Sequence, residues 1–248
     1  MTSEIVLQTV GLHMAFGGLR IFDSIDFSLL RGEHHAIIGP NGAGKSTFVN
    51  LVSGLLRPTG GRVLLGQRDV TRATPQQRVR AGLGRTFQIN TLFPSLAPLE
   101  AVVLALCERD DVTAPSLRAV ARHSARIDEA AALLDRFGLL ADARQPTGLL
   151  AYGKQRVLEM VLAFALKPQV LLLDEPAAGL TTSQGHALFD QLATLAGDTS
   201  VLFIEHDMAL VFGYAQRVTV LGGGALIAQG TPDEIRADPL VRKAYLGH

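Results

Sequence analysis

One segment of the chain has the residue types and spacing of a phosphate-binding loop. Gly39–Thr47 reads GPNGAGKST and matches the pattern G-x-x-x-x-G-K-[ST]. The glycines allow the backbone to turn its N–H groups inward around an anion, and the N-terminus of a following helix adds partial positive charge. Lys45 can reach the β- and γ-phosphates of a nucleotide, and the Ser46 hydroxyl can ligate Mg²⁺. The apolar run His35–Ile38 precedes the loop, so we expect a strand, this loop and then a helix over about 45–53.

Two acidic residues at the end of an apolar run could complete a magnesium–nucleotide site. Leu171–Leu173 leads directly into Asp174 and Glu175. Adjacent residues of one strand point to opposite faces, so Asp174 can serve the water shell of a metal ion while Glu175 faces an attacking water. A surface turn explains such a pair equally well on its own. Together with the loop at 39–47, the pair predicts phosphoryl-transfer chemistry.

A histidine follows the next apolar run. Val201–Ile204 is followed by Glu205, His206 and Asp207. A histidine at the end of a strand is often structural. At the carboxyl edge of a parallel sheet, where α/β proteins bind ligands, it is also a candidate functional residue.

The patterns around these residues predict an α/β fold. Val170–Leu173 and 201–204 are short aliphatic runs typical of strands buried on both faces of a parallel sheet. A helix expected over about 183–195 separates them, which gives a strand–helix–strand crossover. The first 35 residues read as short strands, and 218–228 reads as a hairpin around three glycines.

The middle of the chain, about 91–165, has mostly helical patterns. Apolar positions step by three and four residues from Leu117 to Phe137, and a second buried helix is expected over 158–166. We therefore expect a helical subdomain inserted into the α/β core.

Composition limits the class of protein. Of 248 residues, 48% are hydrophobic and 19% charged, which excludes a disordered chain. Lys and Arg total 23, as do Asp and Glu, so the bulk positive charge of many nucleic-acid binders is missing. The single cysteine, Cys107, cannot form an internal disulfide and is expected to be a small buried residue. No apolar run approaches the roughly 20 residues of a spanning helix, and no basic segment precedes an apolar one at the N-terminus, so we expect a cytoplasmic protein.

These segments together resemble the ATP-binding subunit of an ABC transporter, over nearly the whole chain. Between the phosphate loop and Asp174 that family has a glutamine at the junction with its helical subdomain, matched here by Gln88, and a signature loop, matched by Leu150–Gln155. Phe16 lies where the family has its adenine-stacking aromatic residue. His206 lies where the family has its switch histidine.

Within this family the chain is most similar to the LivG-like branch, which serves branched-chain amino acid importers. The similarity rests on RTFQ at 85–88, LAYG at 150–153, DEPAAGL at 174–180, IEHDM at 204–208 and AYLG at 244–247. Tyr152 is the most discriminating position, since most signatures of the family have glycine there. Two residues depart from the family pattern: Ala151 replaces the usual signature serine, and Thr181 stands where many members have an aspartate.

The resemblance implies a P-loop NTPase (RecA-like) α/β core with an antiparallel β subdomain and an inserted α-helical subdomain. The whole chain, 1–248, would be one ABC ATPase domain, with its core at about 1–90 and 166–230, its helical subdomain at about 91–165 and a helical tail at about 231–248. Glu175 would polarise the attacking water, His206 would steady the γ-phosphate, and Lys45 would act on both binding and catalysis. The implied nucleotide-binding residues are Phe16, Gly39, Pro40, Asn41, Gly42, Ala43, Gly44, Lys45, Ser46, Thr47, Gln88, Ala151, Tyr152, Gly153 and Lys154. The implied ligands of Mg²⁺ are Ser46, Gln88 and Asp174.

The resemblance also implies partners. Two ATPase subunits would enclose two ATP molecules and drive a separate membrane permease, with an external substrate-binding protein involved indirectly and no nucleic acid. Such a subunit would sit on the cytoplasmic face of the plasma (inner) membrane. Because Ala151 lacks the signature hydroxyl, a heterodimer with a paralogous subunit is expected, and a homodimer stays open.

Several alternatives to this interpretation stay open. The cargo is chosen by other chains, so urea or amide import and export of a lipid-like cargo are compatible with the sequence. A soluble ABC ATPase acting on nucleic acid or ribosomes is a rival class. A non-catalytic regulatory subunit is disfavoured by intact Lys45, Asp174, Glu175 and His206.

Overall fold

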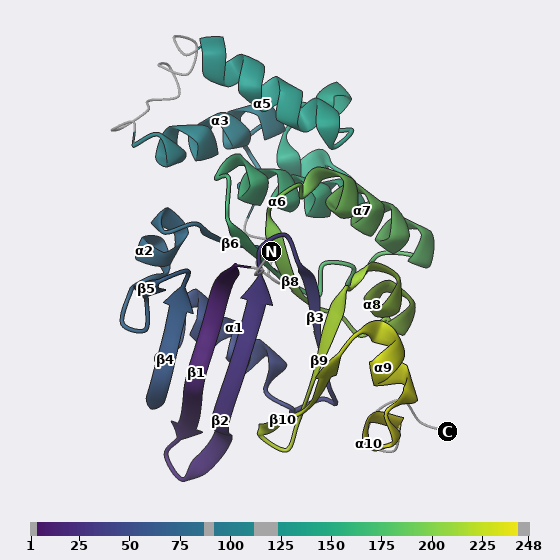
Figure 1. Ribbon diagram of the computed structural model, residues 1–248. Helices are drawn as coiled ribbons and strands as arrows, with labels where there is room; N and C mark the ends of the chain where they lie inside the picture. Colours follow the sequence, from purple (N-terminus) through teal and green to yellow (C-terminus); the bar gives the residue numbers. More distant parts are fainter. Residues whose placement is uncertain (1–3, 87–91, 112–123, 243–248) are drawn as a thin grey trace. The chain divides into compact units, whose positions relative to one another are not determined.

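The computed structural model describes residues 4–86, 92–111 and 124–242, which form two compact units (Figure 1). Unit 1 contains residues 1–85, 169–176 and 196–248. Unit 2 contains 86–168, which includes the range expected to be helical, and also 177–195.

The first sheet of unit 1 is antiparallel, with the strand order β2-β1-β4-β5. Its strands are β1 (Ile5–Phe16), β2 (Leu19–Leu30), β4 (Gly60–Leu65) and β5 (Arg68–Asp69). The expectation of short strands in the first 35 residues was wrong, because β1 and β2 have twelve residues each. Register shifts at several points let this long ribbon stay paired from Ile5–Leu30 to Phe16–Leu19.

The second sheet of unit 1 has the order β10-β9-β3-β8-β7-β6. Its strands are β3 (His34–Ile38), β6 (Leu83–Arg85), β7 (Val170–Asp174), β8 (Ser200–Ile204), β9 (Arg217–Gly222) and β10 (Ala225–Gly230). All neighbouring pairs except the β9–β10 hairpin are parallel. Every residue of β7 and β8 is buried, which confirms the prediction from their aliphatic runs.

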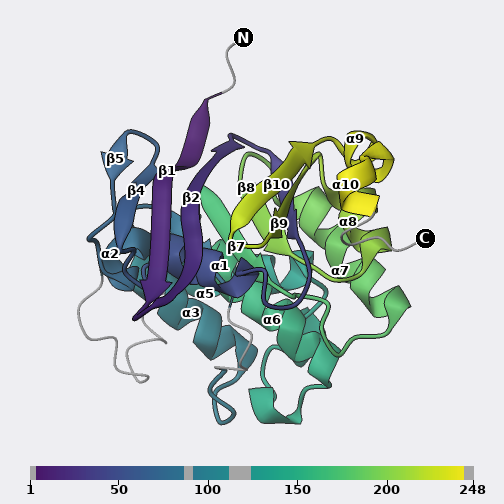
Figure 2. The same ribbon diagram turned by 90° about the horizontal axis from the view of Figure 1, so that it is seen from below.

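Helix α1 (Lys45–Ser53) lies between the two sheets of unit 1 (Figures 1 and 2). Phe48 meets Phe22 and Phe27 of β2 edge-on, with ring centroids 6.5 and 5.4 Å apart. At the other end of α1, the fully buried Arg78 of α2 (Pro75–Arg80) donates hydrogen bonds to the carbonyl oxygens of Leu51 and Val52. These bonds satisfy carbonyls that the helix itself leaves unpaired. Ring packing against β2 therefore holds the first half of α1, and hydrogen bonds from α2 hold its C-terminal end.

In the part of unit 1 that the structure describes, helices also follow β8. They are α8 (Met208–Tyr214), α9 (Pro232–Ala237) and α10 (Pro239–Val241). Thr231 and Glu234 cap α9 reciprocally, and the Asp238 side chain caps α10.

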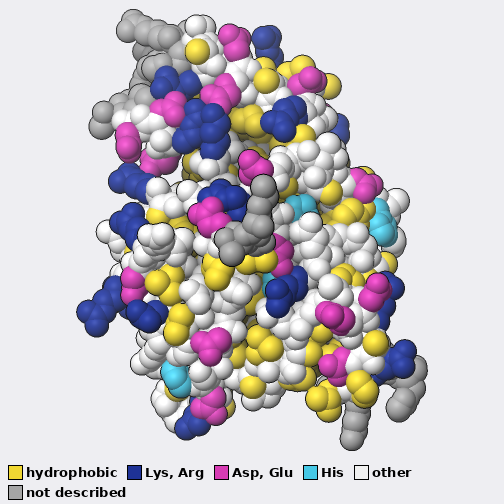
Figure 3. Space-filling model, viewed as in Figure 1, with side chains coloured by type: hydrophobic (Ala, Val, Ile, Leu, Met, Phe, Trp, Pro, Cys, Tyr) yellow, Lys and Arg dark blue, Asp and Glu magenta, His cyan; other side chains and the backbone are white. Residues whose placement is uncertain are grey.

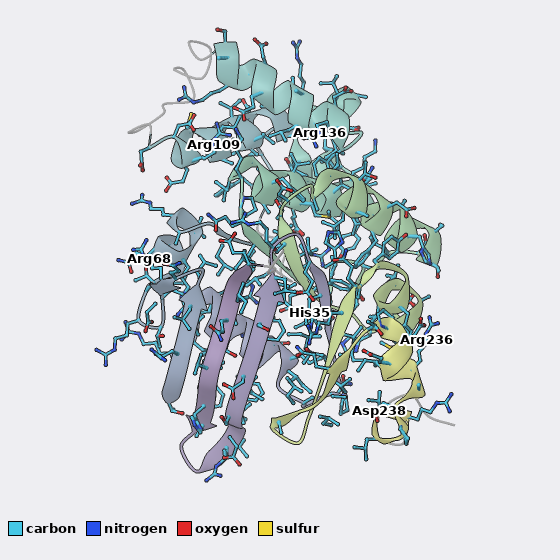
Figure 4. The ribbon with its side chains drawn as sticks, in the orientation of Figure 1. His35, Arg68, Arg109, Arg136, Arg236 and Asp238 are labelled. Atoms are coloured by element: carbon cyan, nitrogen blue, oxygen red, sulfur yellow. The ribbon has the colours of Figure 1, made fainter. Side chains whose placement is uncertain are left out.

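Unit 2 is helical, with α3 (Pro98–Arg109), α5 (Ser124–Arg136), α6 (Tyr152–Ala165), α7 (Thr182–Leu195) and short 3₁₀ turns at Leu140–Asp142 and Thr147–Leu149. Arg109 is the last residue of α3 (Figure 4), and its guanidinium is 2.7 Å from Oε1 of Glu129 on α5 and 2.8 Å from Asp110 Oδ1. These carboxylates raise the pKa of Arg109. Cys107 is buried in α3, as expected.

Helix α6 begins at Tyr152, six residues before the expected start at Leu158. The first turn contains a glycine and polar residues, so apolar periodicity did not reveal it. The part of the expected helix over 117–123 lies outside the described residues, and α5 begins at Ser124.

None of the helices in the described ranges has the length and apolar character needed to cross a membrane. On the face drawn in Figure 3, Lys and Arg side chains are interspersed with Asp and Glu side chains. This agrees with the equal totals of basic and acidic residues in the sequence.

Candidate functional site

Three neighbouring parallel strands of unit 1 end at the same edge of the sheet. Strand β8 pairs with β3 on one side and with β7 on the other, and all three run in the same direction. The loop at 39–47 follows β3, the residues 205–207 follow β8, and Asp174 is the last residue of β7. The topology therefore brings together residues that are far apart in the sequence, such as Lys45 and His206, which are 161 positions apart, at the edge where α/β sheets bind ligands.

Two glycines of the loop are required by their surroundings. Gly39 has φ 151°, and a Cβ added there would overlap the carbonyl oxygen of Leu221. Gly44 has φ 93°, and a Cβ there would lie 2.6 Å from Cζ of Phe22. A side chain at either position would force the loop off the sheet, so the glycine pattern has a steric cause in this fold.

The ammonium group of Lys45 lies inside the loop. Its Nζ donates to the carbonyl oxygens of Gly39, at 2.7 Å, and Pro40, at 3.1 Å. Burial lowers the pKa of Lys45, and the carboxylates of Glu175 and Asp174 act in the opposite direction. The charge is thus held at the centre of the loop, where phosphate oxygens could replace the two carbonyls as its acceptors.

The N-terminus of α1 carries no side-chain cap. Gly44 is the N-cap residue, and the first turn contains no acidic side chain. Its first N–H groups and the exposed hydroxyl of Ser46 can therefore bind an anion or ion from outside the chain. Thr47 is half-buried on the same turn.

Asp174 is 4% exposed, and its two oxygens differ. Oδ2 lies 3.3 Å from Nη2 of Arg85, whereas the buried Oδ1 has no hydrogen-bond partner. Burial raises the pKa of Asp174 despite the opposing charge of Arg85. A buried carboxylate oxygen without a partner is destabilising unless a donor or cation meets it, so this atom fits a ligand of Mg²⁺.

A metal ion at this site would need ligands from a nucleotide. Across the residues that the structure describes, no group of three His, Cys, Asp or Glu side chains could hold an ion by itself. Ser46 and Asp174 would supply one oxygen each, and phosphate oxygens would supply others.

Arg85 is a site residue whose role the sequence did not reveal. Besides Asp174, its guanidinium binds Asn50 Oδ1 at 2.8 Å and Ser53 Oγ at 2.6 Å. It therefore links the end of β6 to α1 and to the carboxylate at the end of β7. Arg85 belongs to the RTFQ segment that resembles the family, but no local sequence pattern predicts its contact with Asp174, which is 89 residues away.

The placement of Glu175 corrects the sequence argument. The strand ends at Asp174, and Glu175 has φ 50°, in the left-handed region. The two carboxylates are therefore separated by a turn of the backbone rather than by the alternation of one strand. The Glu175 N–H donates to Ile204 O at 3.0 Å, and its Oε1 lies 2.8 Å from Nε2 of His206.

His206 is held by its neighbours in sequence. Its backbone N–H donates to Oε2 of the buried Glu205 at 3.1 Å, and the Asp207 side chain caps α8 through Ala209 N and Leu210 N. These bonds fix the turn after β8 and leave the imidazole beside Glu175. The imidazole of His206 and the carboxylate of Glu175 therefore lie side by side in unit 1.

Phe16 is the last residue of β1, directly before the glycine turn to β2. It is 48% exposed, which leaves a ring face open for stacking. Gln88, also predicted at the site, lies outside the described residues, as does the AYLG segment at 244–247.

The signature residues lie in unit 2, at the start of α6. Ala151 is the N-cap residue and makes no side-chain cap, and Gly153 follows in the first turn. Lys154 Nζ lies 2.6 Å from Asp142 Oδ2, so this predicted nucleotide contact has an ionic partner within the chain. Tyr152 is 43% exposed, and its hydroxyl donates to Ala178 O.

The second departure from the family pattern, Thr181, has a structural use. Its Oγ1 accepts from Gln184 N at 3.3 Å, and its own N–H donates to Gln184 Oε1 at 3.0 Å. This reciprocal pair caps the start of α7.

Residues 22–178 match the family model described as ABC transporter, and residues 225–248 match the model described as branched-chain amino acid ATP-binding cassette transporter. The high-affinity branched-chain amino acid transport ATP-binding protein LivG of Escherichia coli (strain K12) is 39% identical over 254 aligned residues, covering 99% of both chains. The corresponding protein BraF of Pseudomonas aeruginosa is 35% identical over 99% of both.

Solved structures are similar over the whole chain. The ADP conformation of an ATP-binding cassette of an ABC transporter has a TM-score of 0.85 at 27% identity, covering 99% of this chain and 100% of that one. A nucleotide-free ATP-binding cassette from an ABC transporter has a TM-score of 0.83 at 27% identity, covering 98% and 100%. Both comparisons confirm the expected α/β architecture with its antiparallel sheet and helical insertion.

Proposed function

The chain belongs to the ABC transporter family of ATP-binding subunits, and we propose that it binds Mg²⁺–ATP at the strand edge of unit 1 and hydrolyses its γ-phosphate there. One observation carries this proposal. Three neighbouring strands of one sheet end at the same edge, and their ends carry the ammonium of Lys45, the unpartnered oxygen of Asp174 and the Glu175–His206 pair.

Binding would use the phosphate loop and the start of α1. The 39–47 backbone and the start of α1 donate N–H groups to the phosphates, and Lys45 exchanges its two carbonyl acceptors for phosphate oxygens. The bound Mg²⁺ supplies neutralisation of phosphate charge. Ser46 and Asp174 would hold the ion, with Gln88 as a further ligand, and Phe16 would stack on the adenine.

Hydrolysis would depend on the pair after β7 and β8. Glu175 would accept a hydrogen bond from the attacking water and orient it, since its carboxylate follows the same strand as Asp174 and is not one of the proposed ligands of Mg²⁺. His206 Nε2 lies 2.8 Å from that carboxylate, and with ATP bound it would donate to a γ-phosphate oxygen instead. Lys45 stabilises the negative charge of the transferring group.

A second ATP-binding subunit would complete the site. One phosphate loop leaves part of the γ-phosphate open, and the segment Ala151–Lys154 of each subunit would cover the nucleotide of the other. Ala151 offers no hydroxyl and no cap to α6. We therefore favour a heterodimer with a paralogous subunit, over a homodimer.

The work done with this ATP is proposed to be import of branched-chain or related amino acids. Its support is the pair of relatives named for branched-chain amino acid transport, each aligned over 99% of both chains, and the match at 225–248. The chain would act on the cytoplasmic face of the membrane, beside a permease that receives cargo from an external binding protein.

Reconstitution tests both the activity and the cargo. The chain would be co-expressed with its adjacent-gene permease and paralogous ATPase, purified, and placed in proteoliposomes with the binding protein. ATP hydrolysis that rises with leucine, isoleucine or valine supports the proposal, while a rise with urea or amides only would contradict the cargo. No hydrolysis in a complex that forms normally would contradict the ATPase assignment, with Lys45→Ala as the inactive control.

A further inference from the structure

The first residue of α6 is hydrogen-bonded to the loop that follows Glu175, within unit 2. The hydroxyl of Tyr152 donates to the carbonyl oxygen of Ala178 at 3.1 Å. The same ring covers Gly179, where an added Cβ would lie 3.0 Å from Tyr152 Cε1. Gly179 has φ 78°, so the chain turns tightly beneath the ring.

A second group fixes the direction of this hydroxyl. Nε of Arg156, one helical turn along α6, donates to the Tyr152 oxygen at 3.0 Å, and its guanidinium carbon lies 5.3 Å from the ring centroid. Arg156 is 8% exposed and is itself held by Glu159 at 2.9 Å. Since the hydroxyl accepts from Arg156, its single proton is left for Ala178 O.

The start of α6 lacks the usual local support. Ala151 cannot cap the helix with a side chain. Gln155 binds Leu150 O at 2.9 Å, and Lys154 pairs with Asp142, but both contacts lead back to segments before the helix. The Tyr152 hydroxyl instead bonds to the 177–181 loop. It therefore joins the start of α6 to a segment of unit 2 about 26 residues further along the chain.

That loop is short and internally constrained. Leu180 N donates to Ala177 O at 3.1 Å, and Thr181 closes the loop by capping α7 with Gln184. Ala178 is three residues after Glu175 in the chain. A displacement of the Ala178 carbonyl is therefore passed to Glu175 through very few backbone dihedrals.

We propose that Tyr152 is a positioning residue: its hydroxyl ties the start of α6 to the 177–181 loop and so couples the signature segment to the placement of Glu175. The expected effect on turnover rests on the proposed function. The hydrogen bond between Tyr152 and the 177–181 loop does not depend on that function. Tyr152 need not touch the nucleotide to act in this way.

Tyr152→Phe tests the tie, because it keeps the ring over Gly179 and under Arg156 and removes only the hydroxyl. Without nucleotide, amide hydrogen exchange in the 177–181 peptide should rise about fivefold, which is the usual effect of one lost hydrogen bond on local opening. Tyr214→Phe, on α8 of unit 1, is the matched control and should leave exchange at 177–181 unchanged.

Steady-state kinetics of ATP hydrolysis distinguish three roles of Tyr152: positioning of Glu175, direct contact with the nucleotide, and general stabilisation of the fold. In the full complex with permease and partner subunit, Tyr152→Phe should lower kcat about three- to tenfold and leave KM for ATP within twofold of the wild type. Unchanged exchange at 177–181, or an unchanged kcat, would overturn the inference, as would a rise in KM that accounts for the whole loss. A wild-type complex without ATPase activity would instead contradict the proposed function, and the exchange measurement would still decide the tie.

Discussion

Replacing Glu175 by Gln removes one negative charge from the site and keeps the size of the side chain. The Glu175 N–H is bonded to Ile204 O, and Oε1 lies 2.8 Å from His206 Nε2. A glutamine oxygen can accept at the same point, so the backbone and His206 should keep their positions. The change therefore tests the charge of residue 175 rather than the shape of the loop.

The expected magnitude follows from the role of that charge. A positioned acid–base group contributes about 10²–10⁴ to the rate, equivalent to about 3–5 kcal/mol of transition-state stabilisation. Glu175 also acts electrostatically on Lys45. Because the lost charge has the same sign as the phosphates, Glu175→Gln should bind ATP as tightly as the wild type or more tightly.

Two measurements decide this prediction. The dissociation constant of Mg²⁺–ATP is measured by titration calorimetry, which suits a chain without tryptophan, and kcat is measured by phosphate release from the assembled complex. Asp174→Asn is the contrast, because it removes a proposed ligand of Mg²⁺ and should weaken binding as well as turnover. The reasoning is refuted if Glu175→Gln loses affinity as severely as Asp174→Asn, or if it hydrolyses ATP at nearly the wild-type rate.

Three further predictions concern Lys45, Asp174 and His35. Lys45→Ala should weaken ATP binding by about 10²-fold or more, since a buried ammonium makes charge-assisted hydrogen bonds to phosphate. A wild-type affinity measured by calorimetry would disprove the assignment of the 39–47 loop. Asp174→Asn should raise the melting temperature of the nucleotide-free chain or leave it unchanged, because burial raises the pKa of Asp174 and so disfavours its charged form; a clear fall in melting temperature would show that the pair with Arg85 outweighs the cost of burial. Burial lowers the pKa of the His35 imidazole (Figure 4), so the unfolded chain is protonated at His35 at a higher pH than the folded chain. The free energy of unfolding should therefore fall as pH drops below about 6.5, by up to about 1.4 kcal/mol per pH unit. In urea unfolding from pH 5 to 8, His35→Gln should reduce this slope, whereas the exposed His13→Gln should not; equal slopes in all three proteins would contradict the prediction.

Much of unit 1 could be predicted because its signals are local. The loop at 39–47 is specified by consecutive residues, and the strand before it and α1 after it are present as expected. Runs of aliphatic residues suffice to indicate strands buried on both faces, which is why β7 and β8 were recognisable. The hairpin of β9 and β10 was recognisable from its three glycines.

Predictions based on periodicity failed where periodicity was weak. The first turn of α6 reads Tyr-Gly-Lys-Gln and has no apolar stripe, so the helix was expected to begin six residues later than it does. The long β1–β2 ribbon changes register several times, which interrupts the alternation of its side chains and made it read as shorter strands.

The contacts between distant residues were decided only by tertiary structure. Strand order is not encoded in any single segment, yet the two neighbours of β7 determine which contacts form. Because β8 lies on one side of β7, His206 meets Glu175, and because β6 lies on the other, Arg85 reaches Asp174. The left-handed turn at Glu175 likewise depends on the hydrogen bond from its N–H to Ile204 O of the next strand, which holds a non-glycine residue at φ 50°. The sequence by itself was enough to predict which groups of this protein would bind a nucleotide, because that chemistry depends on residue type and local backbone. The fold decided which of these groups lie together, because their separation is set by packing between segments far apart in the chain.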